Sequence, residues 1–432
     1  MPMSKAFEER LFPKLPKIID YFGTPFHIFD EQGIIDTGTN LNRSLQDVRG
    51  FKEYYAVKAL PTPAILKIMK KLEFGLDCSS PSELVLARNT GFRGEDIMFS
   101  SNNTTADIFK IAAADGGCIL NLDDITMIDK VKDFPELICF RYNPGERRTG
   151  NELIGIPVEA KYGLRHDQVI PAYREAIKRG ARRFGLHSMI ISNERNYRYM
   201  VETVHMLLDV IEMVSKELNI KFEFFNISGG IGIPYRPEDS LFDMPAFVRE
   251  TKMHLFQFMQ KNGYVPRMFM ECGRFITGPH GVLVATVTNR MSKYREYIGV
   301  DAATMSVNPR PAIYEKAYHH ITILTPDGKP KLGGEEVVDV VGPLCENSDK
   351  FAKQRLLPKT EVGDIMVQHD TGAHAPAMGG NYNGWLRPQQ LLLRTDGTVK
   401  LIRRTETLDD LFATLHFKPR ILKNSPSLLG RD

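Results

Sequence analysis

The sequence lacks the features that mark membrane, secreted and nucleic-acid-binding proteins. No apolar run in its 432 residues is long enough to span a membrane, and the first twenty residues lack the apolar segment of a secretory signal. Its 56 basic residues nearly balance its 53 acidic ones, and the two signs are interspersed, so the chain offers no basic surface for nucleic acid. We therefore expect neither a membrane nor a nucleic-acid partner.

Cysteines are also few. The chain has five, an odd number. Four of them lie inside apolar, strand-like runs without the paired spacing of a zinc site, namely Cys78, Cys118, Cys139 and Cys272. This pattern predicts reduced thiols, a cytoplasmic protein and no metal.

Eight apolar or β-branched runs alternate with helix-forming stretches over the first two thirds of the chain. The composition is that of a globular protein, with 42% hydrophobic and 25% charged residues, so a large core is available. The runs cover residues 54–59, 74–80, 96–101, 118–124, 137–143, 184–190, 224–230 and 268–274. Eight strands with intervening helices predict an α/β fold, a closed (β/α)8 barrel of the TIM type.

The pattern changes after Gly281 to short alternating segments with turn signals, which predict antiparallel strands joined by hairpins. The segment 24–30 is also strand-like but precedes the first barrel strand, so we expect it to join the same β domain. The predicted barrel covers residues 36–285. The predicted β domain is discontinuous and covers residues 1–35 and 286–432.

Polar residues end several of the predicted barrel strands, where barrel enzymes carry their chemistry. Lys58 ends the first strand, although a lysine at a strand end is usually solvated. The glycine-rich loop 228–232 follows the seventh strand, a common place for phosphate in barrels. Glu271 and Arg274 follow the eighth strand, where the ordinary interpretation is an ion pair. Together, an amine, a phosphate cradle and a carboxylate indicate a cofactor site.

This combination suits pyridoxal phosphate, which needs an amine for its Schiff base, a cradle for its phosphate and an acid at its pyridine nitrogen. The motifs YYAVKA, KYGL, SGGIGIPY, ECGR, NPRPAIY, GPLCENSD and DTGAHA occur in the order seen in fold-type III (alanine-racemase-like) decarboxylases. Among these, the sequence most closely resembles the diaminopimelate decarboxylases.

The resemblance implies a cofactor role for each matching residue. It makes Lys58 the Schiff-base lysine and Glu271 the partner of the pyridine nitrogen. The phosphate loop would consist of Gly229, Gly230 and Gly232. The other residues expected around the cofactor are Asp77, His187, Ser192 and His374.

The resemblance further implies a homodimer whose active site is shared between subunits. Cys345 would reach from the neighbouring subunit as the proton donor, and Glu346 beside it would contact the substrate. Both residues lie in the motif GPLCENSD.

Substrate choice would depend on the far end of the pocket. Arg274, Arg310 and Tyr314 match the positions that hold the distal carboxylate of diaminopimelate. A guanidinium suits this group because it donates two parallel hydrogen bonds to a carboxylate. The alternative for Arg310 is that it only caps a loop before Pro311.

Three positions depart from the family pattern. Met189 replaces a histidine that stacks on the pyridine ring, and a thioether still packs on an aromatic face. His374 replaces a tyrosine that contacts the phosphate, and imidazole donates the same hydrogen bond. Cys272 replaces a proline. These departures predict a divergent subgroup of the diaminopimelate decarboxylases.

The predicted activity is that of a carboxy-lyase, which converts meso-2,6-diaminopimelate to L-lysine and CO2 in the last step of lysine biosynthesis. The first alternative is another fold-type III enzyme, either a decarboxylase of carboxynorspermidine, ornithine or arginine or an amino-acid racemase. The second is a catalytically silent homologue that binds pyridoxal phosphate. A metal-dependent barrel enzyme is disfavoured, because His187 is the only histidine among the strand ends.

Overall fold

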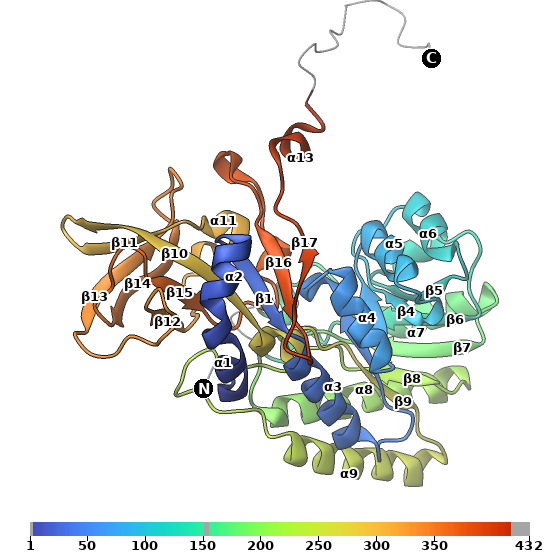
Figure 1. The fold of residues 1–432 in the computed structure, drawn as a ribbon. Coiled ribbons are helices and arrows are strands. Elements are labelled where there is room, and N and C mark those ends of the chain that lie inside the picture. Colours follow the sequence, from blue (N-terminus) through green and yellow to red (C-terminus); the bar gives the residue numbers. More distant parts are fainter. Residues whose placement is uncertain (1–2, 151–154, 416–432) are drawn as a thin grey trace, which may run out of the picture.

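Eight parallel strands close into a barrel in the computed structural model, which describes residues 3–150 and 155–415 (Figure 1). Each strand pairs with the next along the chain, and the last pairs with the first. The strands are β2 (Lys52–Ala56), β3 (Gly75–Cys78), β4 (Gly94–Phe99), β5 (Cys118–Leu122), β6 (Leu137–Arg141), β7 (Arg183–His187), β8 (Phe224–Asn226) and β9 (Arg267–Met270). Each overlaps one of the eight predicted runs, so the predicted barrel is confirmed.

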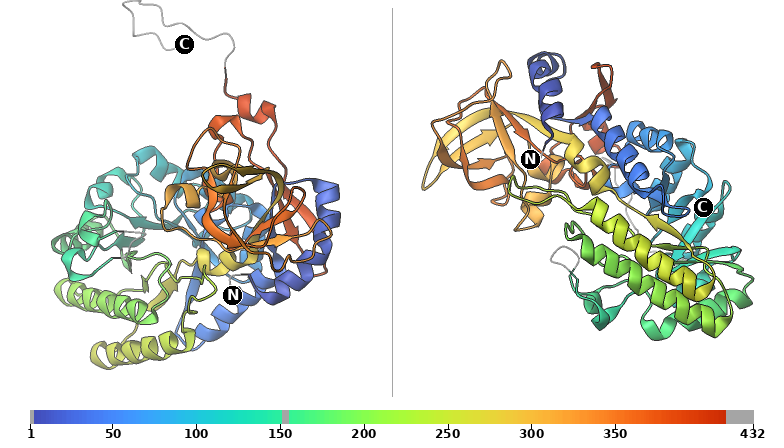
Figure 2. Two further views of the ribbon diagram at one scale, coloured as in Figure 1. Left: turned by 90° about the vertical axis from the view of Figure 1, so that its left-hand side faces the viewer. Right: turned by 90° about the horizontal axis from the view of Figure 1, so that it is seen from below.

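Helices surround the barrel, and their ends follow local signals in the sequence. For example, α9 begins after Asp243, whose side chain accepts a hydrogen bond from the backbone N–H of Ala246. The helix is followed by its capping residue Gly263, which has a φ of 71°. Figure 2 shows α8 and α9 side by side on the outside of the barrel. The helices of this lobe are α3 (Glu31–Leu45), α4 (Pro63–Lys71), α5 (Pro81–Asn89), α6 (Ala106–Ala113), α7 (His166–Lys178), α8 (Tyr197–Leu218), α9 (Met244–Asn262) and α10 (Arg274–Thr277).

Aromatic side chains fill part of the barrel interior. The rings of Phe224 and Phe269 stack with centroids 4.4 Å apart, and Tyr54 packs on Phe269 at 5.2 Å. Gly185 leaves room for this layer, because a Cβ at that position would lie 2.1 Å from the ring of Phe224. The barrel is therefore packed rather than hollow, and polar chemistry is confined to the mouth at the carboxyl ends of its strands.

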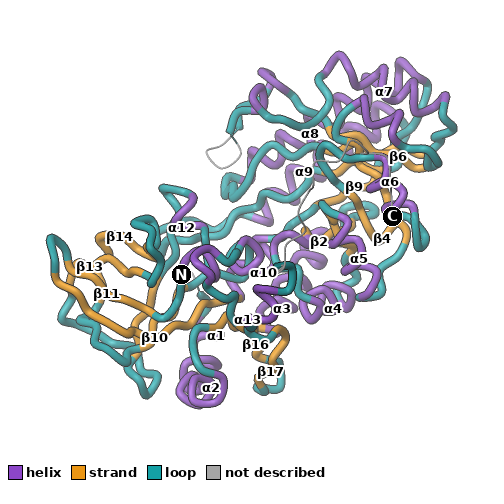
Figure 3. Tube along the Cα trace, turned by 90° about the horizontal axis from the view of Figure 1, so that it is seen from above, coloured by secondary structure: helices purple, strands orange, loops and turns teal. Residues whose placement is uncertain are grey.

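A nine-stranded sheet forms the second lobe, which lies beside the barrel (Figure 3). Strand β1 (Phe26–Asp30) lies between β10 (Gly281–Ser292) and β16 (Gln389–Leu393) in this sheet. The segment 24–30 therefore contributes a strand to the β lobe, as predicted. The remaining strands are β11 (Glu296–Val300), β12 (Ile321–Leu324), β13 (Glu336–Val341), β14 (Lys350–Leu357), β15 (Ile365–Gln368) and β17 (Val399–Arg403). The exact domain limits stay a prediction, and the last of them, residue 432, lies outside the described residues.

The prediction of antiparallel strands joined by hairpins after Gly281 is confirmed for β10 with β11, β13 with β14 and β16 with β17, but it does not hold for every pair of the β lobe. Strand β1 pairs in parallel with β16, and β11 pairs in parallel with β13. Segments far apart in the chain form both pairs, so hairpin signals carry no information about them. The short helices α11 (Thr304–Val307), α12 (Arg310–Ile313) and α13 (Leu408–Phe412) also belong to the carboxyl-terminal third of the chain.

Two helices precede β1, α1 (Lys5–Leu11) and α2 (Leu15–Phe22). Their buried residues Phe7, Leu11 and Leu15 join the apolar cluster of the sheet. The sequence analysis did not predict these helices, because prolines interrupt their pattern. No helix within residues 3–150 and 155–415 combines the length and the apolar character that a membrane span needs.

Candidate active site

The carboxyl ends of the barrel strands surround a cavity of about 250 Å³. The strands β2, β3, β6, β7 and β9 each contribute a polar residue to its lining at or just after their last residue. The residues that matter for the chemistry are Lys58, Asp77, Ser100, Arg141, His187, Met189, Ser228 and Glu271. The structure therefore brings together the predicted lysine, both predicted acids, His187 and the first residue of the glycine-rich loop.

Lys58 and Asp77 bring an exposed amine close to a buried carboxyl. The Lys58 Nζ lies 4.0 Å from the Asp77 Oδ2, and the lysine side chain is 45% exposed, whereas that of Asp77 is 1% exposed. Burial and the neighbouring charge of Glu271 raise the pKa of Asp77 to about 8, against the attraction of Lys58. The Asp77 Oδ1 has no hydrogen-bond partner among the described residues, so it is a buried polar atom available to a ligand.

Glu271 is an ionised carboxylate in a buried place. Burial alone raises the pKa of Glu271, but His187, Lys58 and Ser228 together lower it below the ordinary value. The carboxylate accepts hydrogen bonds from Asn226 Nδ2 at 2.7 Å and from Ser228 Oγ at 2.9 Å. The third partner of this carboxylate is His187, whose Nε2 lies 3.1 Å from the Glu271 Oε2. This arrangement holds a negative charge within the barrel mouth.

His187 is the donor that orients this carboxylate. Burial lowers the pKa of His187, so the ring is neutral and carries its proton on Nε2, toward Glu271. Its Nδ1 is buried and without a partner among the described residues. His187 therefore contacts Glu271 and holds its carboxylate in place.

The glycine-rich loop passes very close to neighbouring backbone. A Cβ on Gly229 would lie 2.3 Å from the carbonyl oxygen of Glu271, and one on Gly232 would lie 2.7 Å from the backbone of Asn193. Gly230 has a φ of 101°, which favours glycine. The backbone of Glu194 holds the loop, since its N–H donates to Gly230 and its carbonyl accepts from Gly232, both at 2.7 Å. The result is a narrow backbone cradle.

Positive charge surrounds His374. His374 is half-buried with a φ of 58°, and its N–H donates to the carbonyl of Ala59 at 2.9 Å. Burial, and then the charges of Arg274 and Lys58, lower the pKa of His374 well below its usual value. A place that disfavours a further cation favours an anion such as phosphate.

A second cavity of about 740 Å³ lies around Tyr235. The Arg310 guanidinium lies 5.4 Å from the ring of Tyr235 and 5.6 Å from that of Tyr314. Arg274 donates a hydrogen bond to the Tyr235 hydroxyl, and its Nη2 lies 3.5 Å from the Ser192 Oγ. The structure therefore brings Arg274, Arg310 and Tyr314 together around one tyrosine.

Arg310 is a buried cation without a paired anion among the described residues. It is 5% exposed, and it pairs with no carboxylate in the part of the chain that the structure describes. Its Nε is buried and has no hydrogen-bond partner there. Because an unpaired buried charge is costly, this side chain favours an anionic group in the cavity.

Cys345 and Glu346 lie apart from both cavities. They are exposed on the loop between β13 and β14, where the N–H of Cys345 donates to Asn383 Oδ1 at 2.9 Å. The buried Asp349 carboxylate shapes this loop, since it accepts from the N–H groups of Thr304 and Leu344, each at 2.8 Å. Within one chain, these two predicted residues are not brought to Lys58.

The site fits pyridoxal phosphate by the chemistry of its groups. Lys58 offers an amine, Glu271 an ionised carboxylate, and the loop at Gly229 and Gly230 a cradle that a Cβ would fill. Met189 lines the cavity, and the Ser228 hydroxyl donates to its sulfur at 2.9 Å. A thioether is therefore present in the cavity, as the sequence predicted. The described residues contain no cluster of three or more groups suited to hold a metal ion.

Sequence analysis missed three residues of this site, Arg141, Asn226 and Tyr235. Arg141 ends β6 and lies 3.7 Å from the ring centroid of Tyr162, while Asn226 ends β8 and donates to Glu271. Both obey the strand-end rule that selected Lys58, so the rule could have found them. Tyr235 ends the motif SGGIGIPY, but no spacing rule indicates its contact with two arginines.

The raised pKa of Asp77 predicts a stability change that depends on pH. A carboxyl whose folded pKa lies above its unfolded value destabilises the folded state progressively as pH rises from about 4 to about 8. We expect Asp77→Asn to raise the Tm of the cofactor-free protein by about 2–4 °C at pH 8 and by much less at pH 4.5. Thermal unfolding at the two pH values measures this, and an equal gain at both would contradict the assignment.

Comparisons with known proteins identify the family. Residues 36–278 match the model of the pyridoxal-dependent decarboxylases, pyridoxal binding domain. The chain is 45% identical to Protein TabA of Pseudomonas amygdali pv. tabaci, over 97% of both chains. It is 31% identical to the diaminopimelate decarboxylase of Methanothermobacter thermautotrophicus, over 94% of this chain and 95% of that one.

A solved structure gives the same result. The crystal structure of diaminopimelate decarboxylase from Methanocaldococcus jannaschii superposes with a TM-score of 0.83 at 27% identity, over 94% of this chain and 95% of that one. The barrel, the β lobe and the cofactor chemistry of the mouth agree with these matches. The chain belongs to the family of pyridoxal-dependent decarboxylases that includes the diaminopimelate decarboxylases, and its cofactor is pyridoxal phosphate.

Proposed function

We propose that this decarboxylase converts meso-2,6-diaminopimelate to L-lysine and CO2, the last step of lysine biosynthesis. The observation that carries the proposal is Arg310, a buried guanidinium without a carboxylate partner among the described residues, beside Arg274. A substrate with a second carboxylate far from its reacting centre would neutralise it. The 31% identity to an enzyme named diaminopimelate decarboxylase supports the same substrate.

The residues of the chain would divide the work as follows. Bound pyridoxal phosphate supplies an electron sink for the carbon that loses CO2. Lys58 holds the cofactor covalently, and the ionised Glu271 keeps a proton on its pyridine nitrogen. Arg310 and Arg274 grip the distal carboxylate, so that the D-configured centre is the one presented for reaction. Tyr314 covers the guanidinium of Arg310.

The proton that replaces CO2 would come from Cys345 of a second subunit. Because Cys345 is exposed and lies outside both cavities, its proposed role requires a homodimer in which Glu346 also reaches the substrate. All five cysteines are free thiols, which supports a cytoplasmic location for such an enzyme.

A mixing experiment tests the shared site. Lys58→Ala and Cys345→Ala homodimers should each be inactive, whereas subunit exchange should restore about a quarter of the wild-type activity, since half of the dimers then contain one intact site. Decarboxylation is measured before and after exchange, with light scattering as the measure of mass. An active monomer, or no recovery in verified mixed dimers, would exclude this arrangement.

Removing Arg310 tests the substrate. Arg310→Ala should lower kcat/KM for meso-diaminopimelate by about 100-fold, because two charge-assisted hydrogen bonds are lost. D-lysine lacks the distal carboxylate and should lose little. Steady-state kinetics with both substrates measure the difference, and an equal loss for both would argue against this role of Arg310.

The main alternative is a different substrate specificity. The identity to Protein TabA, 45%, is higher than the 31% identity to the diaminopimelate decarboxylase and supports this alternative. Decarboxylases of carboxynorspermidine, ornithine or arginine, or an amino-acid racemase, would act at the same Lys58. For a distal ammonium, however, we expect a buried acid, whereas the two acids that line the Tyr235 cavity are Asp239, which pairs with Arg195 at 2.9 Å, and Glu315, which is exposed. A silent homologue would have no chemical need for the network around Glu271.

A further inference from the structure

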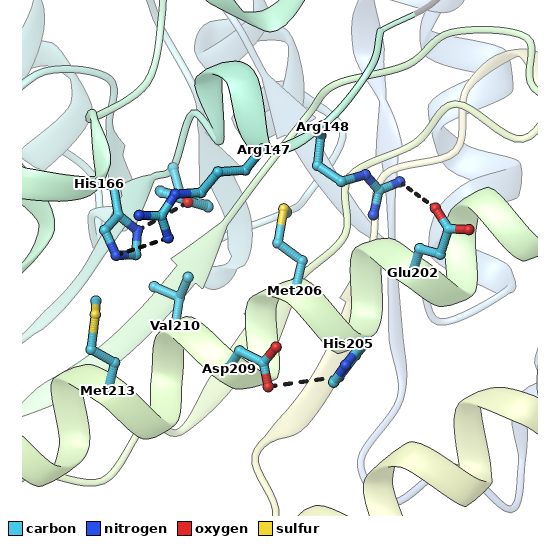
Figure 4. A pocket seen from close by; sticks show the side chains of 10 residues that line it. Arg147, Arg148, His166, Glu202, His205, Met206, Asp209, Val210 and Met213 are labelled. Carbon is cyan, nitrogen blue, oxygen red and sulfur yellow. Dashed lines mark hydrogen bonds and ion pairs between the residues drawn. The ribbon is translucent and has the colours of Figure 1, made fainter.

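A separate pocket of about 510 Å³ lies on the outer side of the barrel (Figure 4). One wall consists of Tyr142, Arg147 and Arg148, which follow β6, and of His166 at the start of α7, and the helix α8 forms the other wall. This pocket shares no lining residue with the Lys58 cavity or the Tyr235 cavity. Its volume suits a small molecule.

Arg147 gives the loop wall an available positive charge. Its Nη1 lies 3.1 Å from His166 Nε2, and it pairs with no carboxylate within residues 3–150 and 155–415. Burial, and then the charge of Arg147, lower the pKa of His166, so the neutral ring accepts from Arg147 at Nε2 and donates from Nδ1 to the Tyr142 hydroxyl, 3.1 Å away. This chain of hydrogen bonds orients the guanidinium.

The neighbouring Arg148 already pairs with an acid and packs on an aromatic ring. The Arg148 Nη2 lies 3.4 Å from a carboxylate oxygen of Glu202, and its guanidinium lies 4.3 Å from the ring of Tyr199. Of the two arginines in this wall, only Arg147 is therefore left for an anion.

Asp209 gives the helix wall an available negative charge. No lysine or arginine of the described structure pairs with it, its ionisable neighbours are His205, whose Nδ1 lies 3.7 Å away, and His254, and the Asp209 side chain is 64% exposed. Met206, Val210 and Met213 also line the pocket; they are spaced along one face of α8 and point toward the loop wall (Figure 4). The pocket thus has a cation on one wall, an anion on the other and an apolar floor.

We propose that this pocket binds a free α-amino acid with an aliphatic side chain. Arg147 would bind the carboxylate through two parallel hydrogen bonds, and Asp209 would bind the ammonium. The aliphatic chain would pack on the two methionines and Val210, where thioethers adapt to its shape. A ligand with one charged group would leave the opposite wall unpaired, so the site selects a zwitterion.

Methyl NMR of the holoenzyme locates the ligand directly. L-Leucine is titrated into protein labelled with 13C at its methionine methyls, with Met206 and Met213 assigned from Met206→Leu and Met213→Leu. Met189 reports separately on the active site. We expect saturable shifts of Met206 and Met213. 4-Methylpentanoate, without the ammonium, and 3-methylbutylamine, without the carboxylate, should each bind at least about tenfold more weakly.

Charge-removing variants test the two walls. Arg147→Gln and Asp209→Asn should each weaken leucine binding by about tenfold or more, while their other methionine signals show that the fold is kept. Arg165→Gln is the matched control, because Arg165 is exposed, pairs with Asp167 and does not line the pocket. Shifts confined to Met189, no saturable shift at all, or binding that neither variant weakens would each overturn the proposal.

Discussion

Replacing Lys58 with alanine is expected to abolish decarboxylation, with kcat at least about 10⁴-fold below that of the native enzyme. Lys58 is the one lysine in the cavity that holds Glu271 and Asp77, so no neighbouring amine lines the cavity to replace it. The visible absorbance band of the covalently attached cofactor should disappear as well. Absorbance spectra and a CO2-release assay on the purified variant measure both effects.

A lysine on the same strand provides the control. Lys52 lies at the opposite end of β2 and forms an exposed ion pair with Asp96, with its Nζ 2.5 Å from Oδ1. Lys52→Ala should keep the absorbance band and near-native activity, because an exposed ion pair contributes little. If Lys58→Ala kept the band, the assignment of Lys58 would be wrong.

Glu271→Gln is expected to lower kcat by about 100-fold to 1000-fold while the fold is kept. The carboxylate is ionised and buried, held by Asn226 and Ser228, so it can keep a proton on the pyridine nitrogen, whereas a neutral amide of the same shape cannot. Steady-state kinetics, together with the absorbance band as a measure of cofactor occupancy, separate this effect from loss of the cofactor.

A second buried glutamate controls for the change from acid to amide. Glu53 on β2 accepts a hydrogen bond from the N–H of Cys272 but does not line the cavity, and burial raises its pKa well above the ordinary value. Because burial disfavours the charged form of Glu53 and its side chain does not line the cavity, Glu53→Gln should change kcat by less than about threefold. Equal losses in the two variants would mean that Glu271 has no specific role.

The barrel and its chemistry were predictable because both follow local rules. Each of the eight strands is a short apolar run between helical segments, and Lys58 and Glu271 come directly after two of them. The same rule applied to every strand would also have found Arg141 and Asn226. What the rule cannot give is ionisation: only the packing shows that Glu271 carries the charge while the pKa of Asp77 is raised.

The β lobe was less predictable, since its order depends on contacts between distant segments. Strand β1 lies beside β16, more than 350 residues later, and no local pattern encodes that pair. The interaction of Arg310 and Arg274 with Tyr235 is equally non-local. Cys345 shows a further limit, because a residue that acts in a second subunit has no partner to be found within one chain.

Met189 and His374 depart from the family pattern, and the structure shows what surrounds each of them. Met189 lines the cavity beside Ser228, so the change alters a surface that faces the cofactor. The backbone N–H of His374 donates to the Ala59 carbonyl, and burial together with nearby cations lowers the pKa of its imidazole, so the ring adds no positive charge near neutral pH. Neither change removes a group that decarboxylation requires.

One measurement tests the central claim most directly. The purified holoenzyme is incubated with meso-diaminopimelate, ornithine, arginine and carboxynorspermidine in parallel, and the products are quantified by chromatography. We expect L-lysine from meso-diaminopimelate and no amine product from the other three. If the absorbance band is present but L-lysine does not form, or if another substrate reacts faster, the enzyme is not a diaminopimelate decarboxylase.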